Sequence, residues 1–206
     1  MKSSGNHLIL VICSMLVTMF IFSCNSKNEK KQVTSDPPVP TAINRIPETD
    51  PAELEALISK DSLNTDLRLR LAALYYERRE LEKAVYHNEV VLKIDEGNPA
   101  SLFNLGNLCY DLERNESAVD YYTKFLEYDP KNTNVRCDLA TCWMRLNKYD
   151  KAIDLLRENI RIDPEHLQSH HNLSVVLKQT GRLKEAELEL QIFNEILSKM
   201  KKQERN

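Results

Sequence analysis

A short pattern of residues recurs along most of this chain at a fixed interval of 34 residues. Its clearest marker is alanine, at Ala84, Ala118, Ala152 and Ala186, with no insertion or deletion between copies. A period of this length with two helical patterns per unit is typical of a stacked array, in which neighbouring units bury one another's hydrophobic faces. The period constrains the fold more than any other feature, and it predicts an all-α solenoid.

Composition supports helices and disfavours a nucleic-acid partner. Four glycines in 206 residues leave little room for loop-rich β architecture. The 28 basic and 31 acidic residues nearly cancel, and lysines gather only in two short runs, at residues 27–31 and 199–202. A nucleic-acid footprint would need a clustered basic face, so we expect no nucleic-acid partner.

Each unit combines a first helix that carries a large residue followed by a small one with a second helix that carries the marker alanine. The small residues let two helix backbones approach closely. Pro130 and Pro164 follow the second helices of two units, where proline cannot extend the preceding helix. The large-small pairs are Leu71-Ala72, Leu105-Gly106, Leu139-Ala140 and Leu173-Ser174.

This order of leucine, small residue, alanine and Asp-Pro at fixed offsets resembles the tetratricopeptide repeat over residues 65 to about 197. The resemblance implies helix-turn-helix units stacked in a right-handed superhelix. Arg68, Leu102, Arg136 and His170 stand where the family usually has tryptophan. The expected units are 65–98, 99–132, 133–166 and 167–200, with a tail at 201–206.

Both ends of the array are expected to be capped. Residues 51–64 align with the second half of a unit and begin with Pro51, with Asp50 as the candidate N-cap. In the last unit, Glu187 and Asn194 replace the apolar residues that earlier units carry at the same positions. A terminal unit needs a polar outer face for solubility, so we interpret these substitutions as the C-terminal cap.

Residues 1–23 have the pattern of a secretory signal peptide. Leu8 to Phe22 is an uncharged run of 15 residues, which is short for a membrane-spanning helix. The run ends at Ile21-Phe22-Ser23-Cys24, which resembles a bacterial lipobox, although Phe22 is bulkier than usual. The resemblance implies cleavage before Cys24 and a covalent lipid on its sulfur. The alternative is an uncleaved signal anchor.

The segment after Cys24 is polar and contains Pro37, Pro38, Pro40 and Pro47. Such a composition cannot bury enough apolar surface to fold, so residues 24–50 are predicted to form a lipidated tether. More than one acyl chain is needed for stable anchoring. We therefore expect a lipid-anchored protein of the bacterial cell envelope in the outer membrane, and leave open which side it faces.

In the resembling family, the first helices line a concave groove that binds ligands. Transferring the family's groove positions to this sequence gives a set of apolar, aromatic and small polar residues. We therefore expect the partner to be a peptide or helix from another envelope protein, held by apolar anchors and amide groups. The residues do not match the family's clamp for C-terminal carboxylates. The predicted groove consists of Leu69, Tyr76, Phe103, Asn107, Tyr110, Cys137, Thr141, Met144, His171 and Lys178, with Ala73 and Val175 beside them.

The sequence shows no pattern for catalysis or a resident cofactor. No nucleophile is paired with a base, and no glycine loop suits a phosphate. His166 and His170 are four residues apart but lack a matching third ligand, so a surface pair is favoured over a metal site. Cys109 and Cys142 are interpreted as buried thiols, with a bridge between them as the alternative.

These observations predict a membrane-anchored adaptor that is not an enzyme and binds no metal or cofactor apart from its lipid. The alternative is an accessory subunit of an envelope enzyme or of a carbohydrate-handling system. The tripeptide Asp61-Ser62-Leu63 also resembles a bacterial O-glycan acceptor, and a helix-ending turn explains it equally. The sequence decides neither the partner nor the oligomeric state.

Overall fold

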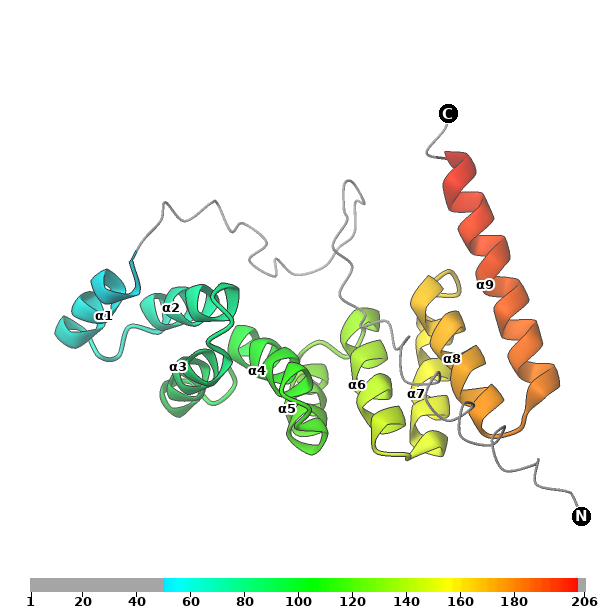
Figure 1. Ribbon diagram of the computed structural model, residues 1–206, viewed down its shortest axis with the longest axis horizontal. Helices are drawn as coiled ribbons and strands as arrows, with labels where there is room; N and C mark the ends of the chain where they lie inside the picture. The colour runs from blue at the N-terminus through cyan, green and yellow to red at the C-terminus, as the bar shows by residue number, and fades with distance from the viewer. Residues whose placement is uncertain (1–49, 204–206) are drawn as a thin grey trace, which may run out of the picture. The chain divides into compact units, whose positions relative to one another are not determined.

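The computed structural model describes residues 50–203, and within them the chain forms nine α-helices and no strand (Figure 1). The all-α prediction is confirmed. The predicted signal peptide, Cys24 and nearly all of the tether lie outside the described residues. The helices are α1 (Pro51–Lys60), α2 (Thr65–Glu77), α3 (Leu81–Ile94), α4 (Pro99–Asp111), α5 (Asn115–Tyr128), α6 (Thr133–Arg145), α7 (Tyr149–Ile162), α8 (Leu167–Gln179) and α9 (Leu183–Gln203).

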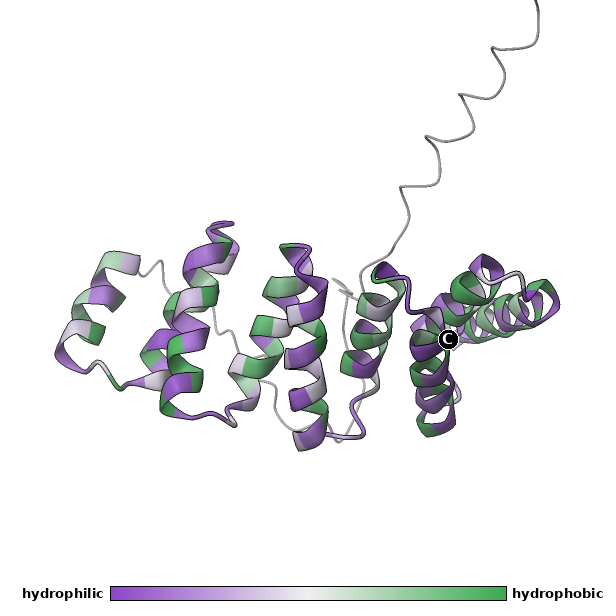
Figure 2. Cartoon of the chain, turned by 90° about the horizontal axis from the view of Figure 1, so that it is seen from below, coloured by the Kyte–Doolittle hydropathy of each residue, from purple (hydrophilic) through white to green (hydrophobic). Residues whose placement is uncertain are grey.

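The helices pack in chain order. Each pair α2/α3, α4/α5, α6/α7 and α8/α9 is in contact, and the second helix of each pair also packs against the first helix of the next. The short helix α1 packs against α2 in the same way. Every helix carries both hydrophobic and hydrophilic residues (Figure 2), as expected when each helix buries one face and leaves another in solvent. The arrangement is a solenoid.

The first helix of each unit begins with a side-chain cap at the same repeat position. Asn64, Asn98 and Asn132 each accept a hydrogen bond from the backbone N–H three residues later, at 3.0 Å in all three cases. In the last unit His166 takes this position, and its Nδ1 accepts from the Ser169 N–H at 3.2 Å. Asp50 caps α1, as predicted, by accepting from the Ala52 N–H at 3.2 Å. These caps satisfy N–H groups that a helix start leaves unpaired.

The turn between the two helices of each unit contains a left-handed residue. Arg79, Glu113 and Asn147 have φ values of 62°, 58° and 56°, and Gly181 has 77°. The positions are one repeat apart, so the turn geometry repeats even though glycine appears only in the last unit. Left-handed backbone is unfavourable for residues with a Cβ, and asparagine tolerates it better than arginine or glutamate.

The close helix contacts lie at the predicted positions. Ala84, Ala118 and Ala152 have no exposed surface, and Ala186 is 7% exposed. The contact is tightest in the second unit, where a Cβ built on Gly106 would lie 2.4 Å from the ring of Tyr122. Tyr122 is the largest residue at its repeat position and is 1% exposed, so Gly106 makes room for it.

In the first, third and last units, the fourth residue holds the preceding turn by a side-chain contact to a backbone carbonyl, whereas the second unit has Leu102 there. Arg68 donates from Nε and Nη2 to the carbonyl of Ser62, six residues earlier, at 3.0 and 2.7 Å. Arg136 makes the equivalent bond to the Pro130 carbonyl, and His170 Nε2 lies 3.0 Å from the Pro164 carbonyl. These residues replace the family's tryptophan with a buried donor that satisfies a turn carbonyl.

The last helix differs from the other second helices in length and exposure. α9 has 21 residues, whereas α3, α5 and α7 have 14 each, and it continues through the first residues of the predicted tail. Glu187 and Asn194 are exposed, as the capping interpretation requires. The outer face is not wholly polar, however, because Leu183 is 63% exposed and Leu190 is 45% exposed.

The three cysteines of the described residues are free and buried. Burial raises the pKa of the Cys109 thiol to about 11 and that of Cys142 to about 12. Both therefore stay protonated at neutral pH and pack as small apolar side chains. The interpretation as buried thiols is confirmed, and the alternative of a Cys109–Cys142 bridge is wrong. Within residues 50–203, no helix has the length and apolar character needed to cross a bilayer.

Candidate functional site: the first-helix face

The predicted groove residues all lie on the first helices, α2, α4, α6 and α8, and we call their shared surface the first-helix face. Its members differ in accessibility. Leu69, Tyr76, Phe103, Asn107, Met144 and His171 are half-buried, and Lys178 is exposed. Tyr110, Cys137 and Thr141 are buried.

Tyr76 and Asp111 connect the first two units across this face. The Tyr76 hydroxyl, on α2, donates to Asp111 Oδ2 at the end of α4, at 3.0 Å. Burial raises the pKa of Tyr76, and the charge of Asp111 and the hydrogen bond to it raise it further. The ring is therefore held in one orientation as a neutral phenol, with part of its surface still accessible.

Tyr110 and Arg145 make the equivalent step between the second and third units. The Arg145 guanidinium lies 3.6 Å from the centre of the Tyr110 ring, and its Nη1 donates to the Tyr110 carbonyl at 3.1 Å. A guanidinium stacked on an aromatic face is attracted by the ring's electron density. The predicted role of Tyr110 as a direct ligand contact needs correction, because Arg145 covers it and leaves it 8% exposed.

Phe103 and Asn107 form the centre of the face on α4. The Phe103 ring packs against Phe125, with 5.8 Å between ring centres. Asn107 Oδ1 accepts a hydrogen bond from the Tyr122 hydroxyl at 2.7 Å. This bond fixes the amide so that Asn107 would meet a ligand as a donor through Nδ2. Both side chains are thus held by the second helix of their own unit.

A polar network closes the face between α6 and α8. Asn172 Nδ2 lies 3.4 Å from Cys137 Sγ and 3.2 Å from Thr141 Oγ1. Gln168 donates to Asn172 Oδ1 at 2.9 Å, so the amide is held from both sides. Cys137 is fully buried and Thr141 is 2% exposed. These two predicted contacts therefore belong to the packing between units, and a ligand reaches neither in this arrangement.

The histidines of α8 have separate structural roles. His166 is a helix cap, and His170, only 3% exposed, places Nδ1 2.6 Å from Glu189 Oε2 on α9. The predicted surface pair is therefore wrong for His170, because α9 covers it. His171 lies on the first-helix face, with its ring 5.3 Å from that of Phe193. Among the described residues, no cluster of three or more His, Cys, Asp or Glu side chains could hold a metal ion.

Sequence reasoning missed the residues that hold the face together, Asp111, Arg145 and Asn172. Asp111 and Arg145 occupy the same repeat position, one residue after the predicted contacts Tyr110 and Met144. A signal was present, since both are charged residues beside members of the face on α4 and α6 that carry no charge. Their partners lie 35 residues away in sequence, and only the stacking of units shows that they meet.

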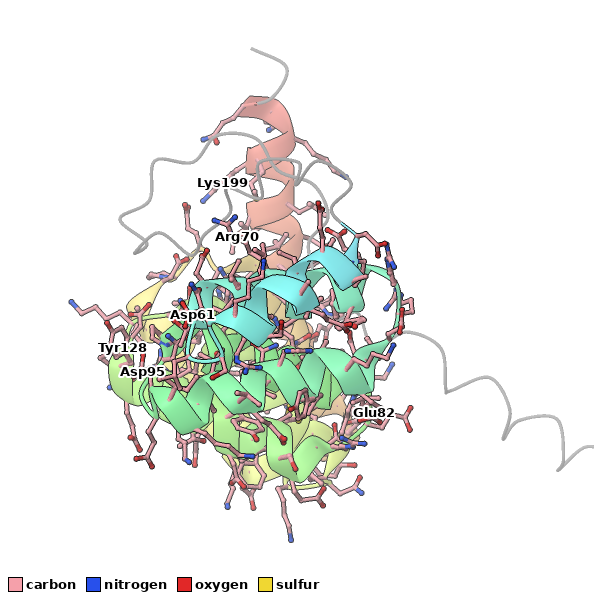
Figure 3. The ribbon with its side chains drawn as sticks, turned by 90° about the vertical axis from the view of Figure 1, so that its left-hand side faces the viewer. Asp61, Arg70, Glu82, Asp95, Tyr128 and Lys199 are labelled. Atoms are coloured by element: carbon pink, nitrogen blue, oxygen red, sulfur yellow. The ribbon has the colours of Figure 1, made fainter. Side chains whose placement is uncertain are left out.

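The edges of the stack are distinct from this face. Looking along the stack, Asp61, Asp95 and Tyr128 lie along one edge, where α1, α3 and α5 end, and Glu82 lies on the opposite side (Figure 3). Two hollows of the described surface, of about 620 and 390 Å³, are lined by α9 residues. They are open furrows along one helix and do not enclose a ligand.

Comparison with known proteins agrees with this architecture. Residues 99–132 match the tetratricopeptide repeat family, and residues 116–191 match the family of anaphase-promoting complex, cyclosome, subunit 3. By sequence, the chain matches no curated protein.

Solved structures titled MamA have a similar fold. One has a TM-score of 0.68 at 17% identity and covers 76% of this chain and 90% of its own. Another, from Desulfovibrio magneticus RS-1, has a TM-score of 0.69 at 13% identity, with coverages of 72% and 84%. A third, MamA AMB-1, has a TM-score of 0.65 at 25% identity, with coverages of 70% and 79%.

The repeated caps, the left-handed turns and the family match define the class. Residues 99–132 match a tetratricopeptide repeat, and the described residues have the fold of a tetratricopeptide-repeat solenoid, with α2 to α9 as its four repeated units. Repeats of this class form protein–protein interaction modules, which is the general function of this region. They are typically scaffolds, not enzymes.

Proposed function

We propose that this protein is a lipid-anchored adaptor of the bacterial cell envelope and that its first-helix face binds a peptide or helix of another envelope protein. The observation that carries this proposal is the set of half-buried residues Leu69, Tyr76, Phe103 and Met144 on successive first helices. Tyr76 and Phe103 are each held in one orientation by the contacts described above. Partly accessible, oriented aromatic side chains are the groups that dominate binding energy at protein interfaces.

The accessible part of the face is expected to favour an amphipathic segment. Its apolar members come mainly from α2 and α4, whereas α6 and α8 are joined by the Asn172 network. His171 and Lys178 add polar groups at the C-terminal end. A bound segment would therefore place apolar anchors against the first two units and polar or acidic groups toward the last one.

Photo-crosslinking in isolated membranes tests the binding face. A photoreactive phenylalanine would replace Phe103 or Tyr76 in the full chain, and matched controls would replace Tyr86 or Tyr128. These two tyrosines are 57% and 66% exposed and lie on second helices. We expect one common adduct from positions 103 and 76 and its absence from the controls. Equal adducts from all four positions would contradict the assignment.

Membrane attachment is tested separately through Cys24. The Cys24→Ala variant should lose lipid labelling and signal-peptide cleavage, because the modified sulfur is absent. Membrane fractionation and the apparent mass of the processed chain measure the two effects, with Cys109→Ala as a control for loss of a cysteine. Normal processing of Cys24→Ala would overturn the lipoprotein assignment and leave the binding-face result unaffected.

A further inference from the structure

The outer face of α9 carries leucines that no other helix of the described residues covers. Leu190 occupies the repeat position of Leu156, which is fully buried, yet Leu190 is 45% exposed. Leu183 is 63% exposed on the same side. The residues that attach α9 to its own unit, Ala186 and Ile196, are 7% and 5% exposed. The helix therefore has one face packed against the array and a second, partly apolar face in solvent.

This outer face has the spacing of a helix-pairing seam. Leu183, Leu190 and Leu197 are seven residues apart, and Glu187, Asn194 and Lys201 follow each of them by four. Alternating steps of four and three residues keep one line of side chains toward a partner helix, as in a coiled coil. We call these six residues the α9 seam.

The length of α9 also points to a partner. The helices α3, α5 and α7 each have 14 residues, whereas α9 has 21, and its last turns extend beyond α8 (Figure 1). Met200, in this extension, is 43% exposed. A helical extension is marginal in water without tertiary contacts, because packing of an apolar face supplies most helical stability.

Charge favours a second copy of the same helix in the opposite direction. Residues 183–193 contain three glutamates and one lysine, whereas residues 194–203 contain one glutamate and three lysines. Glu185 already pairs with Arg157 and Arg182, and Glu189 contacts His170, so Glu187 is the acidic member of the seam. In an antiparallel pair it lies beside the basic half of the second copy. A parallel pair would place Glu187 on Glu187 and Lys201 on Lys201, which is unfavourable.

We propose that the protein forms a two-fold symmetric dimer through antiparallel pairing of the α9 seams of two copies. With the axis beside Ile192, Leu190 of one copy meets Asn194 of the other, and Leu183 meets Lys201. Glu187 then lies within one helical turn of Lys201 in the second copy. The interface is isologous, so both copies use the same residues and the assembly closes at two. This dimer is independent of the first-helix face.

Sedimentation velocity of the full chain in a mild detergent tests the dimer over the micromolar range. We expect reversible dimers for the wild type and at least about a tenfold weaker association for Leu190→Glu, which introduces a charge into the seam. Leu188→Glu is the matched control. Leu188 is 56% exposed but lies about 140° around the helix from the centre of the seam, so its variant should dimerise normally.

Charge reversal separates pairing from effects within one helix. Glu187→Lys and Lys201→Glu should each weaken association, and the double variant should restore it, because the two signs are exchanged across the interface. Within one helix, the dipole favours Glu187 near the N-terminus and Lys201 near the C-terminus, so the double variant is unfavourable at both ends. Recovery of association in the double variant would therefore come from pairing between the two copies. A monomeric wild type, equal effects of Leu188→Glu and Leu190→Glu, or failure of the double variant to recover would overturn the proposal.

Discussion

The third and last units carry the same residue at the same repeat position in two different environments. Leu156 on α7 is fully buried, because α8 of the next unit packs against α7. Leu190 on α9 is 45% exposed, because the described chain supplies no further unit. The difference shows that burial in this fold depends on the neighbouring unit, not on the helix that carries the residue. Variants at this pair, and at three further sets of equivalent repeat positions, test the comparison.

The largest expected effect is a difference between two leucine truncations. Leu156→Ala removes a buried side chain and leaves a cavity, so it should lower the free energy of unfolding by about 2–5 kcal/mol. Leu190→Ala should lower it by less than about 1 kcal/mol, since the side chain already contacts solvent. Urea unfolding followed by circular dichroism measures both at concentrations where the chain is monomeric. Equal losses would show that the last unit is as buried as the third.

The second expected effect concerns the tight contact of the second unit. Gly106→Ala should lower the free energy of unfolding by about 1–3 kcal/mol, because the new Cβ overlaps the buried ring of Tyr122. Alanine's better helix propensity, about 1 kcal/mol, offsets part of this. The last unit has Ser174 at the repeat position of Gly106 and Leu190 at that of Tyr122, so no large ring stands at the equivalent place. Ser174→Ala should therefore be nearly neutral in the same urea titration.

Combining Gly106→Ala with Tyr122→Leu recreates the residue pair of the third unit, Ala140 with Leu156. We expect Gly106→Ala to be less destabilising in the Tyr122→Leu background than alone. The double-mutant cycle measures the coupling between the two sites. If the changes in the free energy of unfolding of the two single variants simply add up in the double variant, the contact between positions 106 and 122 is contradicted.

The third expected effect is the part of the pH dependence of stability that His166 contributes in the last unit. Burial lowers the pKa of His166 below its ordinary value near 6.5. As pH falls, the unfolded state therefore binds a proton at His166 more readily than the folded state does. The stability contributed by neutral His166 is fully present above pH ~6.5 and is lost as pH falls below it. His166→Asn, which copies the cap of the other units, should reduce the loss of stability between about pH 7 and pH 5.

One histidine can change the free energy of unfolding by no more than about 1.4 kcal/mol per pH unit. Urea midpoints across this range measure it, and Asn132→Ala, which removes a cap without a titrating group, is the control. His87, whose pKa burial also lowers, is unchanged in both variants and contributes equally. An unchanged slope in His166→Asn would contradict the assigned pKa shift.

The smallest expected effect is a stabilisation. Glu113 adopts a φ of 58° at the turn position where the last unit has Gly181. Glu113→Gly should raise the free energy of unfolding by about 0.5–1 kcal/mol, because glycine removes the strain of the left-handed backbone. Gly181→Ala should have the opposite sign. The thermal midpoints of the two variants provide the measurement, and a loss of stability in Glu113→Gly would refute the strain argument.

The candidate site was only partly predictable from the sequence. Half-burial of Tyr76 and Phe103 agrees with their predicted place on the face, whereas Cys137 and Thr141 are covered by Asn172. The repeat offsets locate a side chain on a helix, but they do not state what the next unit places over it. Arg145 covers Tyr110 for the same reason. Contacts between units depend on residues that differ from one unit to the next, and a repeat pattern does not describe such residues.

The sequence alone determined the period, the two helices per unit, the alanine contacts and a polar substitution at the end of the array. It could do so because each unit repeats the same local helix signals and the same small-residue contact. The tertiary structure decided which repeat positions are accessible, where turns hold left-handed residues, and that α9 extends with Leu183 and Leu190 in solvent. The exposure of a residue depends on whether a helix of the adjacent unit packs over it, and the pattern within one unit does not contain that information.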